Sequence, residues 1–336
     1  MKLLIVTQKV DEDDQLLGFF IDWLRLLADK FESIIVLCLE EGNYNLPQNV
    51  RVVSLGKDKG KSKLSQLLSF YKYILTGDYN SVFVHMNPIW AVLGGVIWRA
   101  KGKKTYLWYT HKSVTLKLRL AEKFSDKIFT ASPESFRLKS TKVIVTGHGI
   151  DTDLFSPNQE KPVADHGLIK ILSVGRIAPI KNYGILVEAA RVLRERGVGF
   201  VVSMIGEPAL KEDKGYELRL KNKINELGLE GNFKFLGKVG HKNLPPHYQS
   251  NQIFVHLSQT GSLDKTMLEA MASGMIVLSS NDAAKGILPS ELFFDSPQEL
   301  ANKIIGNQST QDLRDYVVKN HDLKNLISKI SNIIQS

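Results

Sequence analysis

Short apolar runs alternate with longer segments of helical periodicity through the first half of the sequence. Residues 3–7 form an apolar run typical of a buried strand, and residues 16–30 then place their apolar side chains at helical spacing. The same pattern predicts further elements, with strands at 34–39, 50–55, 81–86, 105–109, 127–130 and 142–146, and helices at 64–75, 91–100 and 116–124. Strands that alternate with helices indicate a parallel sheet covered by helices on both faces.

The pattern restarts after a connector of glycine, polar residues and proline at 147–167. It predicts strands at 169–174, 199–205, 233–236, 253–257 and 275–280, and helices at 183–196, 217–227, 244–249, 262–273, 297–305 and 312–334. We therefore predict an α/β protein with two Rossmann-like doubly wound domains facing across a cleft. The predicted domains cover 1–160 and 161–310, followed by a C-terminal helix at 311–336. Ligands of such sheets bind outside the carboxyl ends of the strands.

The composition adds bounds on the class of protein. Apolar residues make up 43% of the chain, which is ample for two cores. A single cysteine, Cys38, excludes an internal disulfide and fits a reducing cytoplasm. The N-terminus has no signal-peptide pattern, and the longest apolar run, at 89–98, is about half of what spans a bilayer. We expect a cytoplasmic protein, either free or peripheral at the inner face of the membrane.

The positive charge of the chain is concentrated in one segment. The formal net charge is +9, and the stretch from Arg99 to Lys142 holds twelve Lys or Arg against three acidic residues. One interpretation is a solvated basic face, and the other is a surface for anionic lipid head groups or an acidic acceptor. We expect no nucleic-acid partner, because no helix-turn-helix, zinc-finger or RNP-like pattern is present.

The first stretch that indicates chemistry follows the strand at 169–174 and reads V-G-R-I-A-P-I-K-N. Gly175 allows the chain to turn at the carboxyl end of the strand. Arg176 and Lys181 follow on the turn, and two such cations suit a diphosphate. The competing interpretation is a surface turn whose cations are only solvated.

The second stretch, G-S-L-D-K-T-M-L-E, begins a predicted helix after the strand at 253–257. Backbone N–H groups at the start of a helix bind anions, so Leu263, Asp264 and Lys265 are candidates for a phosphate cradle. Lys265 and Thr266 could add side-chain contacts. Glu269 lies further along the helix, at a distance that suits ribose hydroxyls. The competing interpretation of Glu269 is a solvated helix glutamate.

These stretches, together with F-L-G-K-V at 235–239 and L-E-A-M-A-S-G at 268–274, resemble the retaining glycosyltransferases of family 4 (glycosyl transferases group 1), which have the GT-B fold. The resemblance covers nearly the whole chain and is strongest over 169–280. It implies a hexosyltransferase that moves a sugar from a UDP- or GDP-linked donor to a saccharide or lipid-linked acceptor, with retention and without a metal. The nucleotide sugar is then a substrate, and no cofactor is expected. The C-terminal helix would cross back to the first domain.

The resemblance also implies roles for single residues. Arg176 and Lys181 would neutralise the leaving diphosphate, Val239 would meet the base through its backbone, and Glu269 would hold the ribose. His111 follows the strand at 105–109, where the family often has a histidine beside the donor sugar. The alternative for His111 is a strand-end histidine with only local hydrogen bonds.

The sequence departs from the family pattern at one acidic position. The family commonly carries two glutamates eight residues apart; the second matches Glu269, but the first falls on Gly261. Asp264 could take over part of the missing contact. The departure leaves the donor sugar open, and it keeps a non-catalytic nucleotide-sugar-binding subunit as an alternative function. Another GT-B enzyme, such as a sugar-nucleotide epimerase, is a third hypothesis.

Overall fold

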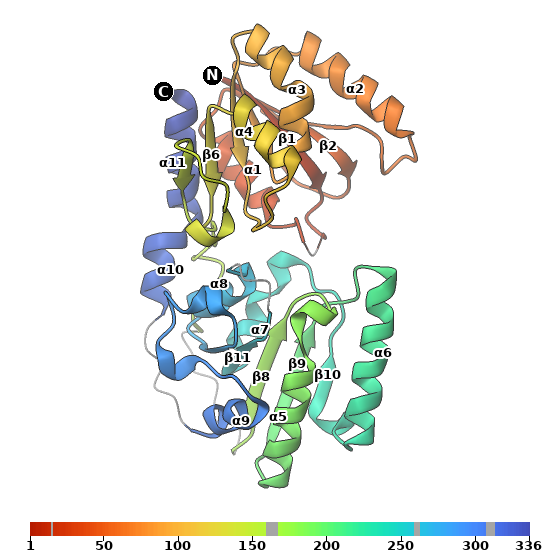
Figure 1. The fold of residues 1–336 in the computed structure, drawn as a ribbon, viewed down its shortest axis with the longest axis vertical. Helices are drawn as coiled ribbons and strands as arrows, with labels where there is room; N and C mark the ends of the chain where they lie inside the picture. The colour runs from red at the N-terminus through yellow and green to blue at the C-terminus, as the bar shows by residue number, and fades with distance from the viewer. Residues whose placement is uncertain (15, 159–166, 259–262, 307–312) are drawn as a thin grey trace. The chain divides into compact units, whose positions relative to one another are not determined.

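The structure is a computed structural model that describes residues 1–14, 16–158, 167–258, 263–306 and 313–336. The chain forms two compact units, Met1–Gly149 with His321–Ser336, and Ile150–Asn320 (Figure 1). Neither division falls where the sequence placed its boundaries, near 160 and 310. Arg314 explains why the second boundary lies after residue 320 and not near 310. Its guanidinium donates hydrogen bonds to the carbonyls of Thr152 and Phe155 and so keeps the helix that starts at Arg314 in the second unit.

The first unit is built on a seven-stranded parallel sheet of order β3-β2-β1-β4-β5-β6-β7. Its strands are β1 (Lys2–Val10), β2 (Ser33–Glu41), β3 (Val50–Ser54), β4 (Ser81–His85), β5 (Lys104–Trp108), β6 (Lys127–Thr130) and β7 (Val143–Val145). Every one was predicted from its apolar run. The strand order reverses between β1 and β4, which makes their carboxyl ends the switch point of this sheet.

Alternation along β1 explains why helices cover both faces of the first sheet. Leu3 and Ile5 belong to one core cluster, and Leu4 and Val6 belong to another, because successive strand side chains point to opposite faces. The first cluster includes α1 (Phe20–Ala28) and α11 (Leu323–Gln335). The second includes the helices of the other face: α2 (Lys63–Thr76), α3 (Ile89–Ala100) and α4 (Leu116–Phe124).

The predicted C-terminal helix at 312–334 is in fact two helices, α10 (Arg314–His321) and α11. Asp322 separates them, because its backbone is extended and its carboxylate accepts a hydrogen bond from the N–H of Asn325. This arrangement is an N-cap, which starts a new helix and ends the continuity of the old one. The apolar side of α11, including Leu326 and Ile330, is buried in the first unit, as the prediction of a returning helix requires.

The second unit contains a five-stranded parallel sheet of order β10-β9-β8-β11-β12. Its strands are β8 (Ile169–Val174), β9 (Phe200–Ile205), β10 (Phe233–Phe235), β11 (Ile253–His256) and β12 (Ile276–Ser279). Its remaining helices are α5 (Gly184–Glu195), α6 (Lys211–Glu226), α7 (Pro245–Gln249), α8 (Lys265–Ala272) and α9 (Pro297–Ile305). The order reverses between β8 and β11, so the predicted motifs of this unit both follow switch-point strands.

Three predicted helix starts are wrong, each for a local reason. Helix α1 begins at Phe20 instead of 16, because the Asp14 carboxylate accepts the N–H groups of Leu16 and Leu17 in a preceding turn. Helix α6 begins six residues earlier than predicted, because its first turns are polar and carry little periodicity. Helix α8 begins at Lys265, as the site below explains. In the part of the chain that the structure describes, we find no helix with the length and apolar character to cross a bilayer.

Candidate functional site

Three neighbouring strands of the second unit end in glycine, at Gly175 after β8, Gly206 after β9 and Gly237 after β10. All three have positive φ, of 155°, 134° and 67°. A Cβ atom on Gly206 would lie 2.1 Å from the carbonyl oxygen of Gly175, so a side chain cannot fit there. These glycines allow the backbone to turn after each strand, and Gly206 allows a close approach to the backbone of Gly175.

The two motifs that the sequence assigned to one ligand meet in the structure. Lys181 closes a short 3₁₀ turn after β8, and its Nζ lies 2.5 Å from Oδ2 of Asp264, the residue that precedes α8. Gly175 has a φ of 155°, a conformation that residues with a side chain rarely adopt, which explains the glycine there. Arg176 lies on the same turn, with its Nε 3.7 Å from the carboxylate of Asp213 in α6.

Asp264 occupies the N-cap position of α8, but its carboxylate does not cap the helix. It faces Lys181 and also His256, whose Nε2 lies 3.0 Å away, and the other ring nitrogen of His256 lies 3.2 Å from Ser279 Oγ. Burial alone would raise the pKa of Asp264, but the His256 hydrogen bond and the Lys181 charge outweigh it and hold that pKa below its usual value. Asp264 therefore carries a negative charge at neutral pH.

The helix start at Lys265 corrects the predicted phosphate cradle. Leu263 is buried in the apolar core, and Asp264 has an extended backbone, so neither lies within the helix. The first-turn amides belong instead to Lys265, Thr266 and Met267, of which the last donates to the Asp264 carbonyl at 3.2 Å. Among the residues that the structure describes, the Thr266 hydroxyl has no hydrogen-bond partner. The candidate anion site thus moves toward Lys265 and Thr266.

Glu269 is 3% exposed, so the interpretation as a solvated helix glutamate is wrong. The Tyr248 hydroxyl donates to its Oε2 at 2.9 Å, and His241 Nε2 lies 3.1 Å from its Oε1. Burial would raise the pKa of Glu269, but the His241 hydrogen bond and the positive charge of Lys265 lower it further than burial raises it. A buried carboxylate needs such partners, and whether it also binds ribose stays a prediction.

Sequence reasoning missed the side chains that hold the two carboxylates. His256 could have been found, because it is a polar residue at the end of an otherwise apolar strand. His241 and Tyr248 gave no local signal, since they reach Glu269 from a 3₁₀ turn and a short helix of their own. Val239 lies just before that turn and packs partly against the core. Its predicted contact with the base stays a prediction.

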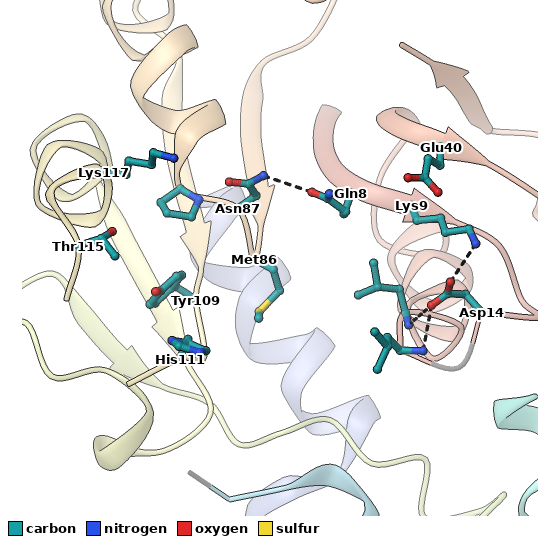
Figure 2. A pocket seen from close by; sticks show the side chains of 13 residues that line it. Gln8, Lys9, Asp14, Glu40, Met86, Asn87, Tyr109, His111, Thr115 and Lys117 are labelled. Atoms are coloured by element: carbon teal, nitrogen blue, oxygen red, sulfur yellow. Dashed lines mark hydrogen bonds and ion pairs between the residues drawn. The ribbon is translucent and has the colours of Figure 1, made fainter. Parts of the chain in front are cut away.

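The first unit contains a cavity of about 600 Å³ at its own switch point (Figure 2). The cavity is lined by residues in or after β1, β2, β4 and β5, by the turn before α1 and by the start of α4. They include Gln8, Lys9, Asp14, Leu16, Leu17, Glu40, Met86, Asn87, Pro88, Tyr109, His111, Thr115 and Lys117. Figure 2 shows Tyr109, His111, Thr115 and Lys117 on one side and Lys9, Asp14 and Glu40 on the other.

Strained backbone marks the middle of this cavity. Met86 has φ of 64°, in the left-handed region that a methionine rarely adopts, and its N–H donates to the Trp108 carbonyl at 2.8 Å. Asn87 follows and donates through its side chain to Gln8 at 3.2 Å. Such strain persists only where the surroundings enforce it, and it is common at binding sites.

His111 lies in the cavity lining and is exposed. Its Nδ1 accepts the N–H of Ser113 at 3.1 Å, and its ring meets Tyr109 edge-on at 6.3 Å. The local hydrogen bond that the alternative interpretation required is therefore present. Because Nδ1 accepts, the neutral ring carries its proton on Nε2, which remains a donor for a ligand. The predicted sugar contact of His111 stays a prediction.

Three of the twelve basic residues between Arg99 and Lys142 have structural roles. Arg99 donates to the carbonyl of Lys123, Lys142 to that of Glu122, and Lys101 to that of Leu75. These carbonyls lie at the C-terminal ends of α4 and α2, where cations are favourable. Lys103 also contacts the fold, because its ammonium lies over the buried Tyr79 ring at 5.7 Å from the ring centre, so internal contacts account for part of this charge.

Comparison with known proteins finds a family model that matches most of the second unit. Residues 155–320 match the family described as Glycosyl transferases group 1. Over 152 residues the chain is 29% identical to mannosylfructose-phosphate synthase of Agrobacterium fabrum, which covers 42% of this chain and 33% of that protein. It is 31% identical over 145 residues to the amylovoran biosynthesis glycosyltransferase AmsK of Erwinia amylovora, which covers 41% of this chain and 34% of AmsK. The chain thus matches about a third of the length of these relatives.

Solved structures extend the likeness to the whole fold. The chain superimposes on Anabaena HepE, solved with UDP and glucose, with a TM-score of 0.80, 18% identity and full coverage of both chains. The chain also superimposes on sucrose-phosphate synthase of Thermosynechococcus elongatus, with a TM-score of 0.76 and 15% identity. The superposition covers 99% of this chain and 98% of that chain. The architecture is therefore the GT-B fold, in which two Rossmann-like units form the chain.

One of the alternative functions is not favoured by these findings. Gly261, on which the non-catalytic alternative rested, lies outside the described residues. The relatives named above are described as a synthase and a glycosyltransferase, so that alternative is not favoured.

Proposed function

We propose that the protein transfers a hexose from a nucleoside diphosphate sugar, UDP- or GDP-linked, to a saccharide or lipid-linked acceptor, with retention and without a metal. The observation that carries the proposal is the contact between Lys181 and Asp264. It brings the cation after β8 and the start of α8 after β11 together at the switch point of the second sheet, where such sheets bind ligands.

The roles follow from charge. When the bond between the sugar and the diphosphate breaks, negative charge develops on the leaving phosphate. Lys181, Arg176 and the first amides of α8 are positioned to stabilise that charge, and fixed groups of this kind are effective because they need no reorganisation during the reaction. In the structure both cations lie next to carboxylates, Lys181 beside Asp264 and Arg176 beside Asp213. A diphosphate would therefore compete with these two acids for the same cations.

The remaining donor contacts are assigned by position. Val239 would contact the base through its backbone, and Glu269 would accept from ribose hydroxyls in addition to its two side-chain partners. Thr266 would contribute its backbone N–H in the first turn of α8, and Asp264 would accept from a sugar hydroxyl. His111 has an Nε2 donor in the first unit's cavity that fits a sugar hydroxyl.

Retention would follow if the acceptor attacks from the face that the leaving group vacates. The bond between the anomeric carbon and the phosphate oxygen breaks, the acceptor oxygen bonds to that carbon, and the acceptor proton passes to the phosphate oxygen. Every step uses groups of the donor and acceptor, with protein cations stabilising charge. No metal is part of this proposal, so EDTA should leave the rate unchanged.

The acceptor side is proposed from the envelope polysaccharide relatives and from charge. AmsK is described as an amylovoran biosynthesis glycosyltransferase, and a relative of Rhizobium meliloti as a lipopolysaccharide core mannosyltransferase. Together with the basic segment 99–142, these descriptions favour a lipid-linked or envelope saccharide as acceptor, and a cytoplasmic protein that is peripheral at an anionic membrane surface.

A donor panel tests the proposal. The full chain is first screened by thermal shift against UDP, GDP and their hexose conjugates, because a selective ligand raises apparent stability by mass action. The selected nucleotide sugar is then incubated with the protein, and slow hydrolysis and transfer to simple saccharides are followed. We expect selective stabilisation and donor turnover that EDTA does not change. Binding of a nucleotide without turnover of any donor would contradict the proposal and would favour a binding subunit.

A further inference from the structure

The outer face of α2 carries exposed leucines that the core does not explain. Leu64, Leu68 and Leu75 are 66%, 61% and 51% exposed, whereas Phe70 and Ile74 of the same helix are fully buried. With 100° per residue, the three leucines fall within an arc of about 40°. A helix that packs on one side ordinarily carries polar residues on the other. The leucines therefore form a second apolar stripe, defined here as the α2 stripe.

Basic residues surround the α2 stripe. The segment before and at the start of the helix reads K-D-K-G-K-S-K, with exposed lysines at 57, 59, 61 and 63 and a single acid. Helix α2 itself contains no Asp or Glu, and Lys72 is exposed beside the stripe. At the other end, the Lys101 ammonium donates to the carbonyl of Leu75. The stripe thus has positive charge at both ends.

The positions of these lysines lower the stability of α2 when the helix is considered by itself. Ser62 is the N-cap, so Lys61 and Lys63 lie at the positive end of the helix dipole, where acidic residues are favourable. Cations at that end destabilise an exposed helix, because they repel its positive dipole end. Their presence is explained if the segment meets a negatively charged surface.

From these observations we propose that α2 is an interfacial helix that inserts the α2 stripe into an anionic lipid bilayer while Lys59, Lys61, Lys63 and Lys72 contact the head groups. A helix with an apolar stripe, basic flanks and low overall hydrophobicity lies in the plane of a membrane surface. The proposal rests on the membrane contact proposed for 99–142 but not on sugar transfer. It extends that contact to a segment of the sequence outside 99–142.

Helix α2 is also well supported for this role. It packs beside α3 on the same face of the sheet, and Tyr71 donates through its hydroxyl to the carbonyl of Leu93 at 3.4 Å. The Phe70 ring packs against Trp90 in a tilted arrangement and against Trp98 edge-on. The helix can therefore expose leucines without loosening, because its other side is anchored by aromatic packing.

Flotation with lipid vesicles tests the proposal on the full chain. Vesicles of neutral phosphatidylcholine are compared with vesicles that also hold phosphatidylserine, at low and high salt. The variant Leu64→Gln with Leu68→Gln removes most of the α2 stripe and keeps good helix formers. Leu218→Gln is the matched control, because Leu218 is 62% exposed on α6 of the second unit. A third variant, Lys61→Gln with Lys63→Gln, removes charge alone.

We expect salt-sensitive binding to anionic vesicles that falls about tenfold in the double-leucine variant and several-fold in the double-lysine variant, as the apolar and ionic contacts imply. Leu218→Gln should bind like the wild type. Equal binding by the wild type and the double-leucine variant would overturn the proposal, and so would wild-type protein that stays unbound. The latter result would instead point to a protein partner for the stripe.

Nucleotide binding by the same variants separates this inference from the proposed function. All of them should keep the thermal shift with the selected nucleotide, because α2 lies outside the second unit. Vesicle binding without any nucleotide binding would refute sugar transfer and leave the interfacial helix standing. Nucleotide binding and turnover without vesicle binding would refute the interfacial helix and leave sugar transfer standing.

Discussion

The two units place different chemistry at equivalent points of their sheets. At the β8–β11 switch point, Lys181, Asp264 and His256 form a buried or half-buried network in which charges are already compensated. At the β1–β4 switch point, a cavity of about 600 Å³ is lined by apolar and polar side chains around strained Met86, and His111 is exposed. The first region is therefore a compensated network of charges, whereas the second is a cavity of mixed lining. The contrast predicts that substitutions in the two regions fail in different ways.

The largest effect should come from removing the buried acid of the second unit. We expect Glu269→Ala to lower the free energy of unfolding by about 3–5 kcal/mol, because it leaves His241 and Tyr248 with polar atoms in a buried space. Denaturant unfolding followed by tryptophan fluorescence measures the loss. Glu269→Gln, which keeps the shape, should lose much less. A similar loss in both variants would show that the hydrogen-bond pattern counts more than the charge.

Catalysis should depend most strongly on the cation that joins the two motifs. Lys181→Met is expected to lower kcat/KM about 100-fold or more, as loss of one fixed stabilising group does. Lys234→Met is the control, since Lys234 is an exposed lysine on β10 of the same unit. Steady-state rates with the donor selected by the panel provide the comparison. Equal rates for the two variants would remove Lys181 from the mechanism.

Acid should weaken the first unit through a histidine that burial keeps neutral. Burial lowers the pKa of His321 to about 4 from an ordinary 6.5. The unfolded chain therefore binds the proton first, and the stabilising contribution of neutral His321 is full above pH 6.5 and is lost as pH falls toward 4. The loss should be on the order of 2–3 kcal/mol. Denaturant curves at pH 7 and pH 5 measure it, and His321→Gln should flatten the dependence.

The smallest effect on stability should come from the first unit's cavity. His111→Ala is expected to change the free energy of unfolding by less than about 0.5 kcal/mol, because His111 is exposed. If its Nε2 contacts the transferred sugar, kcat should still fall about tenfold, as loss of one hydrogen bond implies. Thermal melts and initial rates on the same samples separate the two effects. A loss of stability without a loss of rate would return His111 to a local structural role.

The fold could be predicted because each strand is an apolar run between polar turns, and burial leaves no other place for such runs. What could not be predicted depends on single polar side chains acting locally. The Asp322 cap divides one predicted helix into two, and the extended Asp264 delays the start of α8. Neither residue interrupts the apolar spacing that carried the prediction.

The candidate site divides in a similar way. Arg176, Lys181 and Asp264 were named because their motifs follow the carboxyl ends of predicted strands, and the strand order then brought Lys181 and Asp264 into contact. His241 and Tyr248 were missed, because their contact with Glu269 depends on packing between α7, the preceding turn and α8. A short stretch of sequence does not show which distant side chains will pack together.

The most direct test of the central claim, that the second unit holds a diphosphate between Lys181 and the start of α8, is a paired calorimetric titration. The nucleoside diphosphate selected by the panel and its parent nucleoside are titrated into wild type and Lys181→Met. The claim predicts that the variant loses at least tenfold in affinity for the diphosphate and keeps its affinity for the nucleoside. An unchanged affinity for the diphosphate, or an equal loss for both ligands, would contradict it.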